Sequence, residues 1–329
     1  YSGAYFQSGT VLVAGSDNVG GATNPWPAAL QAGSQTWTFS TNPADPSTGS
    51  LAIYDATTGA LVRAAGNDAI GVGTTTGIPA EDINGVTRLR GTYVDPGAFS
   101  LDLLEITKTI DGGGGGDYLT FTEAEADVST LPTSTDLLLF NEAIVFEAVA
   151  GTYAGSLSAS SSLVTDATRN VTYRPATGSE HGGVAGAGVI IDTGALNTSV
   201  TLEDAHTVVD GFNLTTTTTY CASIVGVGNI VRNCIASATG RGFLVFGGSV
   251  ADPNVLENCV GSGGSSHAFL VLGGGPQSAD SYAKIVNCTG SSTGADAFRT
   301  QATAGGTSAT AEYINCVGLS EFTHQSIGS

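Results

Sequence analysis

Methionine is absent from the 329 residues of this chain, and positive charge is scarce. Lysine and arginine together number 10 against 29 aspartates and glutamates, and the formal net charge is −19. This balance argues against a nucleic-acid partner, because binding a phosphate backbone needs clustered cations. The negative charge helps to keep a glycine-rich surface in solution.

Long apolar runs are missing as well. No stretch approaches the ~18–20 consecutive apolar residues of a membrane-spanning helix, so we expect no membrane span. Only 12% of the residues are charged, whereas glycine supplies 47 positions. Low charge with many Gly, Ser, Thr and Ala residues is typical of turn-dense β proteins, and the length allows two domains.

The two ends of the sequence carry no recognisable signal. The chain begins at Tyr1 and shows no signal peptide, so we expect a processed start or a piece of a longer product. It ends at Ser329, just after a repeat and without an evident cap. Because a stack of repeats needs its last unit covered, we expect a further segment or a partner chain there.

A four-residue phrase returns four times in the C-terminal part of the chain. It consists of an apolar residue, a variable residue and the pair Asn-Cys, and its cysteines follow one another at steps of 25, 29 and 28 residues. A second phrase, centred on a phenylalanine, alternates with it at steps of 26 and 29 residues. Two signals in a constant order, at a slightly elastic period, indicate a stacked repeat. The repeated positions are Asn233, Cys234, Phe243, Asn258, Cys259, Phe269, Asn287, Cys288, Phe298, Asn315 and Cys316.

The composition of the repeat indicates its architecture. The apolar runs are short, β-branched or aromatic, and separated by Gly, Ser, Thr and Asn, which is typical of strands and turns. A repeat of this length with three short strands makes one coil of a parallel β-helix, and successive coils lie ~4.8 Å apart. We predict roughly six to eight coils, right-handed by the crossover rule for parallel strands.

Like residues of successive coils then stack on one another. We expect an interior column of cysteines, a second column of phenylalanines, and asparagines at a corner, where Asn tolerates left-handed backbone angles. If the apolar residue of each phrase points inward, the next residue points outward; these residues are Arg232, Glu257, Val286 and Ile314. The outward column becomes apolar along the stack, which suits a lateral protein contact.

Three segments follow from the pattern. Residues 1–110 hold strand-like runs such as 10–14, 36–40 and 50–54 between Gly, Asn and Pro, and we predict a β-sandwich there. This part has neither His nor Cys, which argues against metal or thiol chemistry. Residues 111–116 are an aspartate and five glycines, and we expect a flexible linker. Residues 117–329 form the predicted β-helix.

The start of the predicted β-helix reads as a short helix followed by less regular coils. Thr122 with Glu125 three residues on predicts a capping box and a short acidic helix that covers the end of the stack. The apolar runs 137–140 and 143–147 are expected to be strands of the first coils.

Residues 117–329 resemble a known group of proteins. The order is Asp117–Thr120, the acidic helix, a Val-Phe-Glu strand ending at Gly151, an extended strand after 165–170, and then Glu180-His181-Gly182-Gly183 before a Val-Val-Asp-Gly-Phe coil. This order is similar to the first part of β-helix proteins encoded among bacteriophage structural genes and in marine bacteria. The resemblance covers about two thirds of the chain.

The resemblance implies a structural component of a phage particle: a capsid decoration or head fibre, or a tail fibre or spike. Residues 1–110 would attach to other particle proteins, and the β-helix would project from the virion surface into the extracellular medium and meet host-surface polysaccharide. Three-fold assembly is usual in such fibres, so a homotrimer is implied. The family fixes no set of catalytic residues, and none is carried over.

The cysteines could bind metal or form disulfides. Their spacing contains no Cys-x-x-Cys pair, which argues against zinc. Stacking explains them as small buried hydrophobic residues with free thiols. His181 and His267 lie in turns beside Gly or Ser, where a structural role is the ordinary one. We therefore expect no metal and no cofactor.

Acidic side chains are the main candidates for catalysis. Enzymes that cleave glycans use two carboxylates, typically ~5–9.5 Å apart. Glu203, Asp204 and Asp210, with His206 between them, are the densest group. They are the catalytic candidates if the chain is a polysaccharide depolymerase, either a hydrolase or a lyase. Solvated turn acids explain the group as well, and a bacterial surface adhesin or filament subunit is a third possibility.

Overall fold

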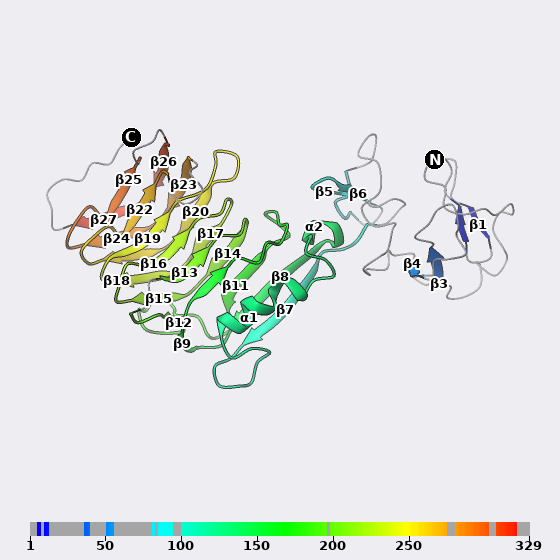
Figure 1. Cartoon of the computed structure of the whole chain (residues 1–329), viewed down its shortest axis with the longest axis horizontal. Helices are drawn as coiled ribbons and strands as arrows, with labels where there is room; N and C mark the ends of the chain where they lie inside the picture. Colours follow the sequence, from blue (N-terminus) through cyan, green and yellow to red (C-terminus); the bar gives the residue numbers. More distant parts are fainter. Residues whose placement is uncertain are drawn as a thin grey trace. The chain divides into compact units, whose positions relative to one another are not determined.

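The computed structural model describes residues 80–82, 85–94, 100–195, 198–274, 280–302 and 307–320, together with the backbone of four short strands nearer the N-terminus. The chain divides into two compact units, and each is described by itself (Figure 1). The first holds Tyr1–Leu104 and Asp136–Glu142, and the second holds Glu105–Thr135 and Ala143–Ser329.

In the described part of the first unit, three pairs of strands are antiparallel. They are β1 (Tyr5–Gln7) with β2 (Thr10–Leu12), β3 (Thr36–Phe39) with β4 (Leu51–Asp55), and β5 (Leu89–Arg90) with β6 (Tyr93–Val94). The strands β2, β3 and β4 overlap the runs predicted as strands. Arg90 is fully buried, and its guanidinium donates to the carbonyls of Leu138 and Leu139 at 3.1 and 3.2 Å.

The run 137–140 was predicted as a strand, and this prediction is wrong. Leu137–Phe140 is a short helix, α2. Asp136 caps its start by accepting from the backbone N–H groups of Leu138 and Leu139, and Asn141 ends it in a left-handed conformation with φ 54°. A short apolar run has no periodicity that separates helix from strand, so the flanking Asp and Asn decide.

The second unit is built around three sheets (Figure 1). The eight-stranded sheet contains β7 (Leu104–Ile110), β8 (Glu142–Ala148), β11 (Val171–Pro175), β14 (Thr207–Asp210), β17 (Ile230–Arg232), β20 (Asn254–Glu257), β23 (Ser281–Val286) and β26 (Ala309–Ile314). The seven-stranded sheet contains β9 (Gly151–Ala154), β12 (Val189–Asp192), β15 (Asn213–Thr216), β18 (Ile235–Ala238), β21 (Val260–Gly263), β24 (Thr289–Ser292) and β27 (Val317–Ser320). The six-stranded sheet contains β10 (Leu157–Ala159), β13 (Thr198–Leu202), β16 (Tyr220–Ile224), β19 (Arg241–Val245), β22 (Phe269–Leu272) and β25 (Phe298–Gln301).

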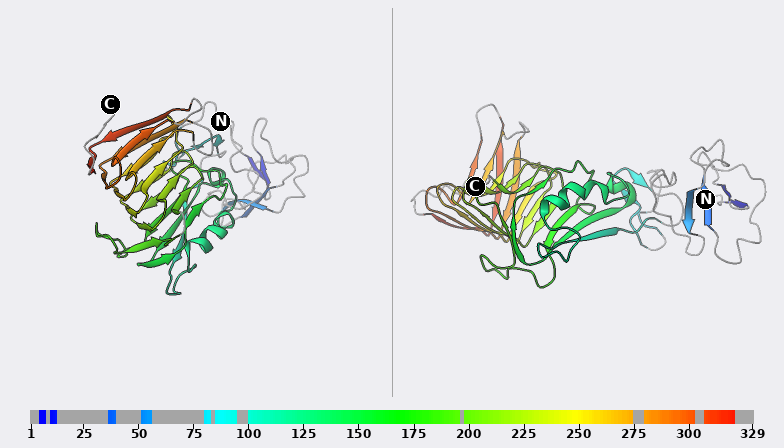
Figure 2. Two further views of the ribbon diagram at one scale, coloured as in Figure 1. Left: turned by 60° about the vertical axis from the view of Figure 1, so that its left-hand side comes forward. Right: turned by 60° about the horizontal axis from the view of Figure 1, so that its bottom comes forward.

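From β8 onward the chain visits the three sheets in turn, and we call each visit to all three a coil. The described residues make six coils and two strands of a seventh. Strands of neighbouring coils pair in parallel, as Val231 with Leu256 and Leu256 with Ile285 illustrate. Figure 2 shows the strands of each sheet lying side by side. The predicted all-β class with long parallel sheets is confirmed, and the arrangement is consistent with a parallel β-helix.

The predicted acidic helix exists, but its start was misplaced. Helix α1 spans Phe121–Asp127, and a 3₁₀ turn, η2, follows at Val128–Thr130. The N-cap is Thr120, whose hydroxyl accepts from the N–H of Glu123 while the Glu123 carboxylate accepts from the N–H of Thr120. Two overlapping Thr-x-x-Glu patterns fit this stretch, and burial of Phe121 selects the earlier one.

The glycine run lies inside the second unit, whereas the sequence predicts a linker between domains there. The Asp111 carboxylate accepts from the backbone N–H groups of Gly113 and Gly115, at 2.8 and 3.0 Å. A side chain at Gly116 would place its Cβ 2.7 Å from the Thr109 carbonyl oxygen. The glycines therefore allow a tight, hydrogen-bonded turn after β7.

The asparagines of the repeat turn the corner between the eight-stranded and seven-stranded sheets. Asn233, Asn258, Asn287 and Asn315 all have φ 53°, in the left-handed region. The side-chain amide of Asn258 donates to that of Asn233, and the amide of Asn315 to that of Asn287, both at 3.3 Å. Each of these bonds joins consecutive coils at the same corner.

The cysteines of the repeat form an interior column beside this corner. Cys234, Cys259 and Cys288 are buried, Cys316 is half-buried, and all are free thiols. Each sulfur lies within hydrogen-bond distance of a carbonyl of the preceding coil, such as Cys259 with Val231 at 3.5 Å. The thiols thus act as small apolar groups with weak donors.

The phenylalanines form a second interior column. Phe243 and Phe269 stack with ring centroids 4.9 Å apart, and Phe269 and Phe298 with centroids 4.8 Å apart. Glycines of the seven-stranded sheet face these rings: a Cβ at Gly261 would lie 2.8 Å from the Phe269 ring, and one at Gly290 would lie 3.0 Å from the Phe298 ring. The small residue two places after each cysteine therefore makes room for a ring.

Substitution of Gly261 by alanine tests this packing. The added methyl would contact the Phe269 ring and the Ala268 carbonyl, 2.8 and 3.1 Å away. We expect the free energy of unfolding to fall by about 1–3 kcal/mol, the usual cost of overpacking. Denaturant unfolding followed by circular dichroism measures it. Ser262→Ala, at the neighbouring exposed position, is the control and should change stability by no more than about 0.5 kcal/mol.

Thiol titration tests the cysteine column. After denaturation without reductant, all five cysteines should react, because none is in a disulfide. In the folded protein the reaction should be slow, since burial raises the pKa of Cys221 to about 12 and also raises that of Cys316. Mass spectrometry of the alkylated protein should find Cys316, the most exposed of the five, labelled first. Labelling of Cys259 before Cys316 would contradict the column.

Candidate functional site

The structure does not bring the three candidate carboxylates into one site. Glu203 and Asp204 follow β13, whereas Asp210 is the last residue of β14. The three steps from Thr207 to Asp210 rise about 10 Å along β14. Of the three acids, only Asp210 lines either of the two hollows described below, and its carboxylate has other partners than that of Asp204.

Asp204 is engaged in holding a turn. Its carboxylate accepts from the backbone N–H and the hydroxyl of Ser161, at 2.5 and 2.6 Å, and from the N–H of Ser162 at 3.1 Å. Ser162 has φ 60°, so these bonds stabilise a left-handed residue between β10 and β11. Asp204 thereby ties the first coil to the second.

Asp210 is engaged at the asparagine corner. Its carboxylate accepts from Arg232 Nε at 2.8 Å and from the Asn233 side-chain amide at 2.7 Å. Arg232 in turn lies beside Glu257 in register, and Glu257 beside Val286. Asp210 is therefore the first member of the row of side-chain hydrogen bonds that the asparagines continue along this corner, and its charge is paired with Arg232.

Glu125 is an acid for which the sequence predicts a different role. The pattern predicts that it completes a capping box with Thr122, but α1 begins two residues earlier, and Oε1 of Glu125 is buried with no hydrogen-bond partner among the described residues. Burial, and then the neighbouring Asp204 carboxylate, raise the pKa of Glu125 to about 8. A carboxyl group of raised pKa beside a second carboxyl group is the pattern of an acid pair, but neither hollow described below is lined by these two residues.

A hollow of about 540 Å³ lies along the asparagine corner. A strap, residues 180–187 between β11 and β12, lies over this corner. His181 Nδ1 accepts from the N–H of Gly183 at 2.9 Å, so Nε2 carries the proton and donates to the Asn233 carbonyl at 2.6 Å. The Asn213 amide donates to the carbonyl of Ala187 at 2.5 Å. The strap thus links the second coil to the third and fourth.

The lining of this hollow is polar on one side and apolar on the other. Arg174 and Asp210 belong to ion pairs, with Glu147 and Arg232, and Glu180 is exposed. Ile235 and Val260 provide the apolar side. From the sequence, Glu180 entered only through a resemblance and His181 also as a turn residue with a structural role. No local pattern indicates that the strap reaches a corner 52 residues further on.

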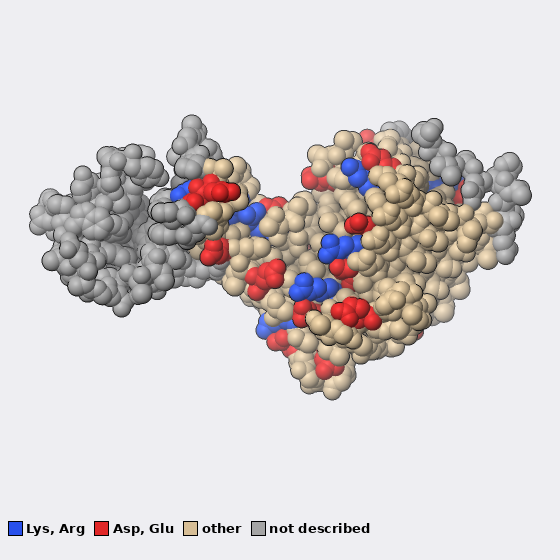
Figure 3. Space-filling model, turned by 180° about the vertical axis from the view of Figure 1, so that it is seen from behind, with Lys and Arg blue, Asp and Glu red and all other residues tan. Residues whose placement is uncertain are grey.

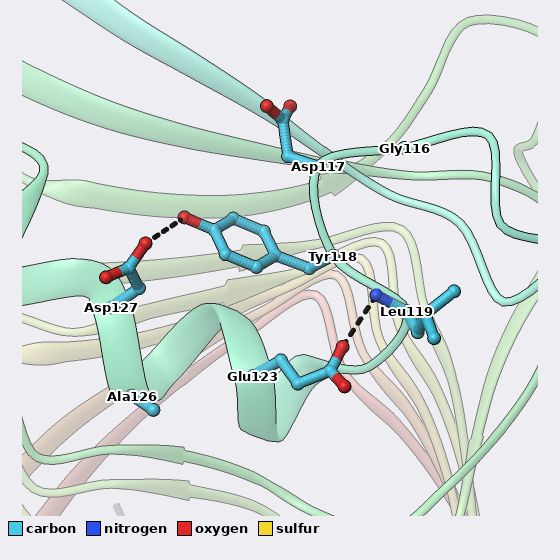
Figure 4. A pocket seen from close by; sticks show the side chains of 7 residues that line it. All are labelled: Gly116, Asp117, Tyr118, Leu119, Glu123, Ala126 and Asp127. Carbon is cyan, nitrogen blue, oxygen red and sulfur yellow. Dashed lines mark hydrogen bonds between the residues drawn. The ribbon is translucent and has the colours of Figure 1, made fainter.

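A second hollow, of about 490 Å³, lies beside α1 (Figure 4). Three carboxylates surround it, and each is already bonded: Asp117 to Lys108, Asp127 to the Tyr118 hydroxyl at 2.8 Å, and Glu123 to the Leu119 N–H at 2.7 Å. The Asp127 bond also raises the pKa of Tyr118, to about 12, after burial as the first cause. These groups hold the cap of the stack together.

The other two histidines in the described part of the chain lie beside acidic residues or their carbonyls. His267 is buried, bonds the Asp296 carbonyl through Nδ1 at 3.0 Å, and has its pKa lowered chiefly by burial. His206 has φ 54° and lies 3.8 Å from Asp252. Within the described residues, no three His, Cys, Asp or Glu side chains are grouped as metal ligands, and none of the helices found there has the length and apolarity to cross a membrane.

Comparisons with known proteins add no relative to this picture: no family model, no curated protein and no solved structure matches the chain.

The pH dependence of stability tests the environment of Glu125. Its pKa is raised in the folded protein, so between about pH 4.5 and 8 the folded state holds a proton that the unfolded state has lost. Stability should therefore fall by about 1.4 kcal/mol per pH unit across this window, and Glu125→Gln should remove that fall. Thermal unfolding at pH 5 and pH 8 measures it.

The control for this experiment is Glu105→Gln, which changes an exposed glutamate of the same unit. It should leave the slope of stability against pH unchanged. A Glu125→Gln protein with the wild-type slope would show that Glu125 is ionised in the folded state.

Proposed function

We propose that the chain is a structural component of a phage particle, a capsid decoration or head fibre, or a tail fibre or spike. In this proposal the second unit is a right-handed parallel β-helix that projects from the virion surface. Residues 1–110 form a β-sandwich that attaches to other particle proteins. Without a matching relative, the proposal depends on the chemistry of this chain and on the resemblance of residues 117–329.

The observation that carries the proposal is that the acidic side chains bond to turns and to neighbouring coils. Asp204 holds the turn between two coils, and Asp210 pairs with Arg232 of the next coil. Arg174 and Lys284 pair with Glu147 and Glu312 of neighbouring coils. Exposed pairs of this kind contribute ~0–1 kcal/mol each, but they fix the register of one coil on the next. Charged side chains that pair between neighbouring coils in this way favour a rigid spacer over a catalyst.

Location in the particle is the direct test. Antibodies against the chain should label purified phage particles from a lysate of the producing strain, and electron microscopy would show where. Label found instead on the surface of uninfected bacteria would favour the adhesin or filament subunit.

The alternative is a polysaccharide depolymerase, and one observation favours it. The hollow at the asparagine corner brings Glu180, His181 and Asp210 to one concave surface, where host polysaccharide would also bind if the role is structural. We nevertheless expect the full chain to release no reducing sugar and no unsaturated uronate from the host capsule, because Asp210 is paired with Arg232.

The activity assay has a matched control. Release by the wild type that is lost in Asp210→Asn and kept in Glu105→Gln would assign the depolymerase activity to this hollow. Release that survives both substitutions would place it elsewhere on the chain.

A further inference from the structure

The outer face of the seven-stranded sheet differs in its charge from that of the eight-stranded sheet. Two outward columns run along it in register. The first passes through Ile235, Val260, Thr289 and Val317, and the second through Thr215, Ser237, Ser262, Ser291 and Leu319. The last charged residue on this sheet is Asp192 of β12. From β15 to β27, no strand of the sheet contains Lys, Arg, Asp or Glu. We call these strands the uncharged face.

The turns that follow the uncharged face carry hydroxyl side chains, and the turn between β24 and β25 also carries Asp296. The hydroxyls of Thr217, Thr239, Ser265 and Thr293 each donate to a backbone carbonyl of the preceding coil, at distances from 2.5 to 3.1 Å. These hydroxyls are therefore occupied within the stack. These four positions add no charge beside the uncharged face, and Asp296 lies further along the turn after β24.

Large apolar side chains are exposed on this face. Val260 is 46% exposed, Val317 56% and Leu319 61%, and Ile314 across the asparagine corner is 43% exposed. They come from three strands near the C-terminal end of the stack, β21, β26 and β27. Contiguous exposed apolar residues usually mark a partner surface.

The eight-stranded sheet provides the contrast. Its outer face carries the pairs Arg174–Glu147, Arg232–Asp210 and Lys284–Glu312. Figure 3 shows this mixture: Lys and Arg lie beside Asp and Glu over part of the described surface, and a broad area without either colour lies next to them. Charge is thus segregated between the faces of the stack.

We propose that the uncharged face is an interface between copies of this chain. Each copy carries a net charge of −19, so two copies repel each other wherever acidic groups face acidic groups. The uncharged face is a surface on which they can approach without burying an unpaired carboxylate. A face that pairs with the same face of a second copy is self-complementary, and its small Ser, Thr and Val side chains permit close approach.

The net negative charge of each copy also determines how salt acts on the association. Salt screens the repulsion between the two acidic copies. It does not weaken the apolar contact between Val260, Val317 and Leu319. Association should therefore strengthen as salt is raised, whereas an interface made of ion pairs would weaken.

The experiment compares two double variants of the full chain by sedimentation velocity at low and high salt. Ser262→Glu with Ser291→Glu places two carboxylates on the uncharged face, at exposed neighbouring positions. Thr310→Glu with Gln301→Glu adds the same charge at exposed positions of the other two sheets. We expect the wild type to associate, the first variant to dissociate with a dissociation constant raised about tenfold or more, and the second to associate like the wild type.

Circular dichroism and thermal unfolding establish that both variants are folded. A wild type that is monomeric at every concentration and salt, or a first variant that associates as well as the second, would overturn the proposal. A monomeric wild type that sediments with insoluble polysaccharide, when the first variant does not, would assign the face to a hydroxylated polymer instead. This inference does not depend on the particle role, since the oligomer can form whether or not antibodies label a phage.

Discussion

The parallel hydrogen-bond ladder between successive coils is the constraint on which the rest of the second unit depends. Once strands of neighbouring coils pair in register, every position of one coil lies directly on the equivalent position of the next. A residue type that suits a position in one coil then suits it in all. The cysteine, phenylalanine and asparagine columns are consequences of this ladder, and the stacked rings add about 0.5–1.5 kcal/mol per pair.

This constraint explains how much of the structure was predictable. The columns were predictable from residue spacing, because the same residue types recur at the same positions of several repeats and such a recurrence does not arise by chance. The position of the capping box of α1 and the presence of the helix α2 were not predictable from the sequence. Each feature occurs once, and two interpretations fitted the same residues. The raised pKa of Glu125 comes from burial and from the Asp204 carboxylate, and neither can be seen in the local sequence. The strap that carries His181 to Asn233 is a contact across coils that leaves no local pattern.

The ladder also determines where polar chemistry is available. Inward positions are filled by apolar side chains and thiols, and the corners are filled by asparagines and hydroxyls that bond the preceding coil. Carboxylates are left with outward positions and turns, and most of those described there are bonded to a neighbouring coil or to their own turn. A site for catalysis would need acids that are held in place and yet free to react. Asp204 and Asp210 are held in place, but each carboxylate is already hydrogen-bonded through both oxygens.

Net charge then links the stack to its surroundings. A chain with 29 acids and 10 cations repels its own copies, yet from β14 onward the acids on described strands all lie in the eight-stranded sheet. Confinement follows from the ladder, because a charge placed in a column meets the same position of the next coil, where a like charge is unfavourable. The eight-stranded sheet meets this condition by alternating sign from Asp210 to Arg232 to Glu257. The seven-stranded sheet meets it by carrying no charge from β15 onward. Because this face is uncharged, a second acidic copy of the chain can approach it without repulsion between carboxylates.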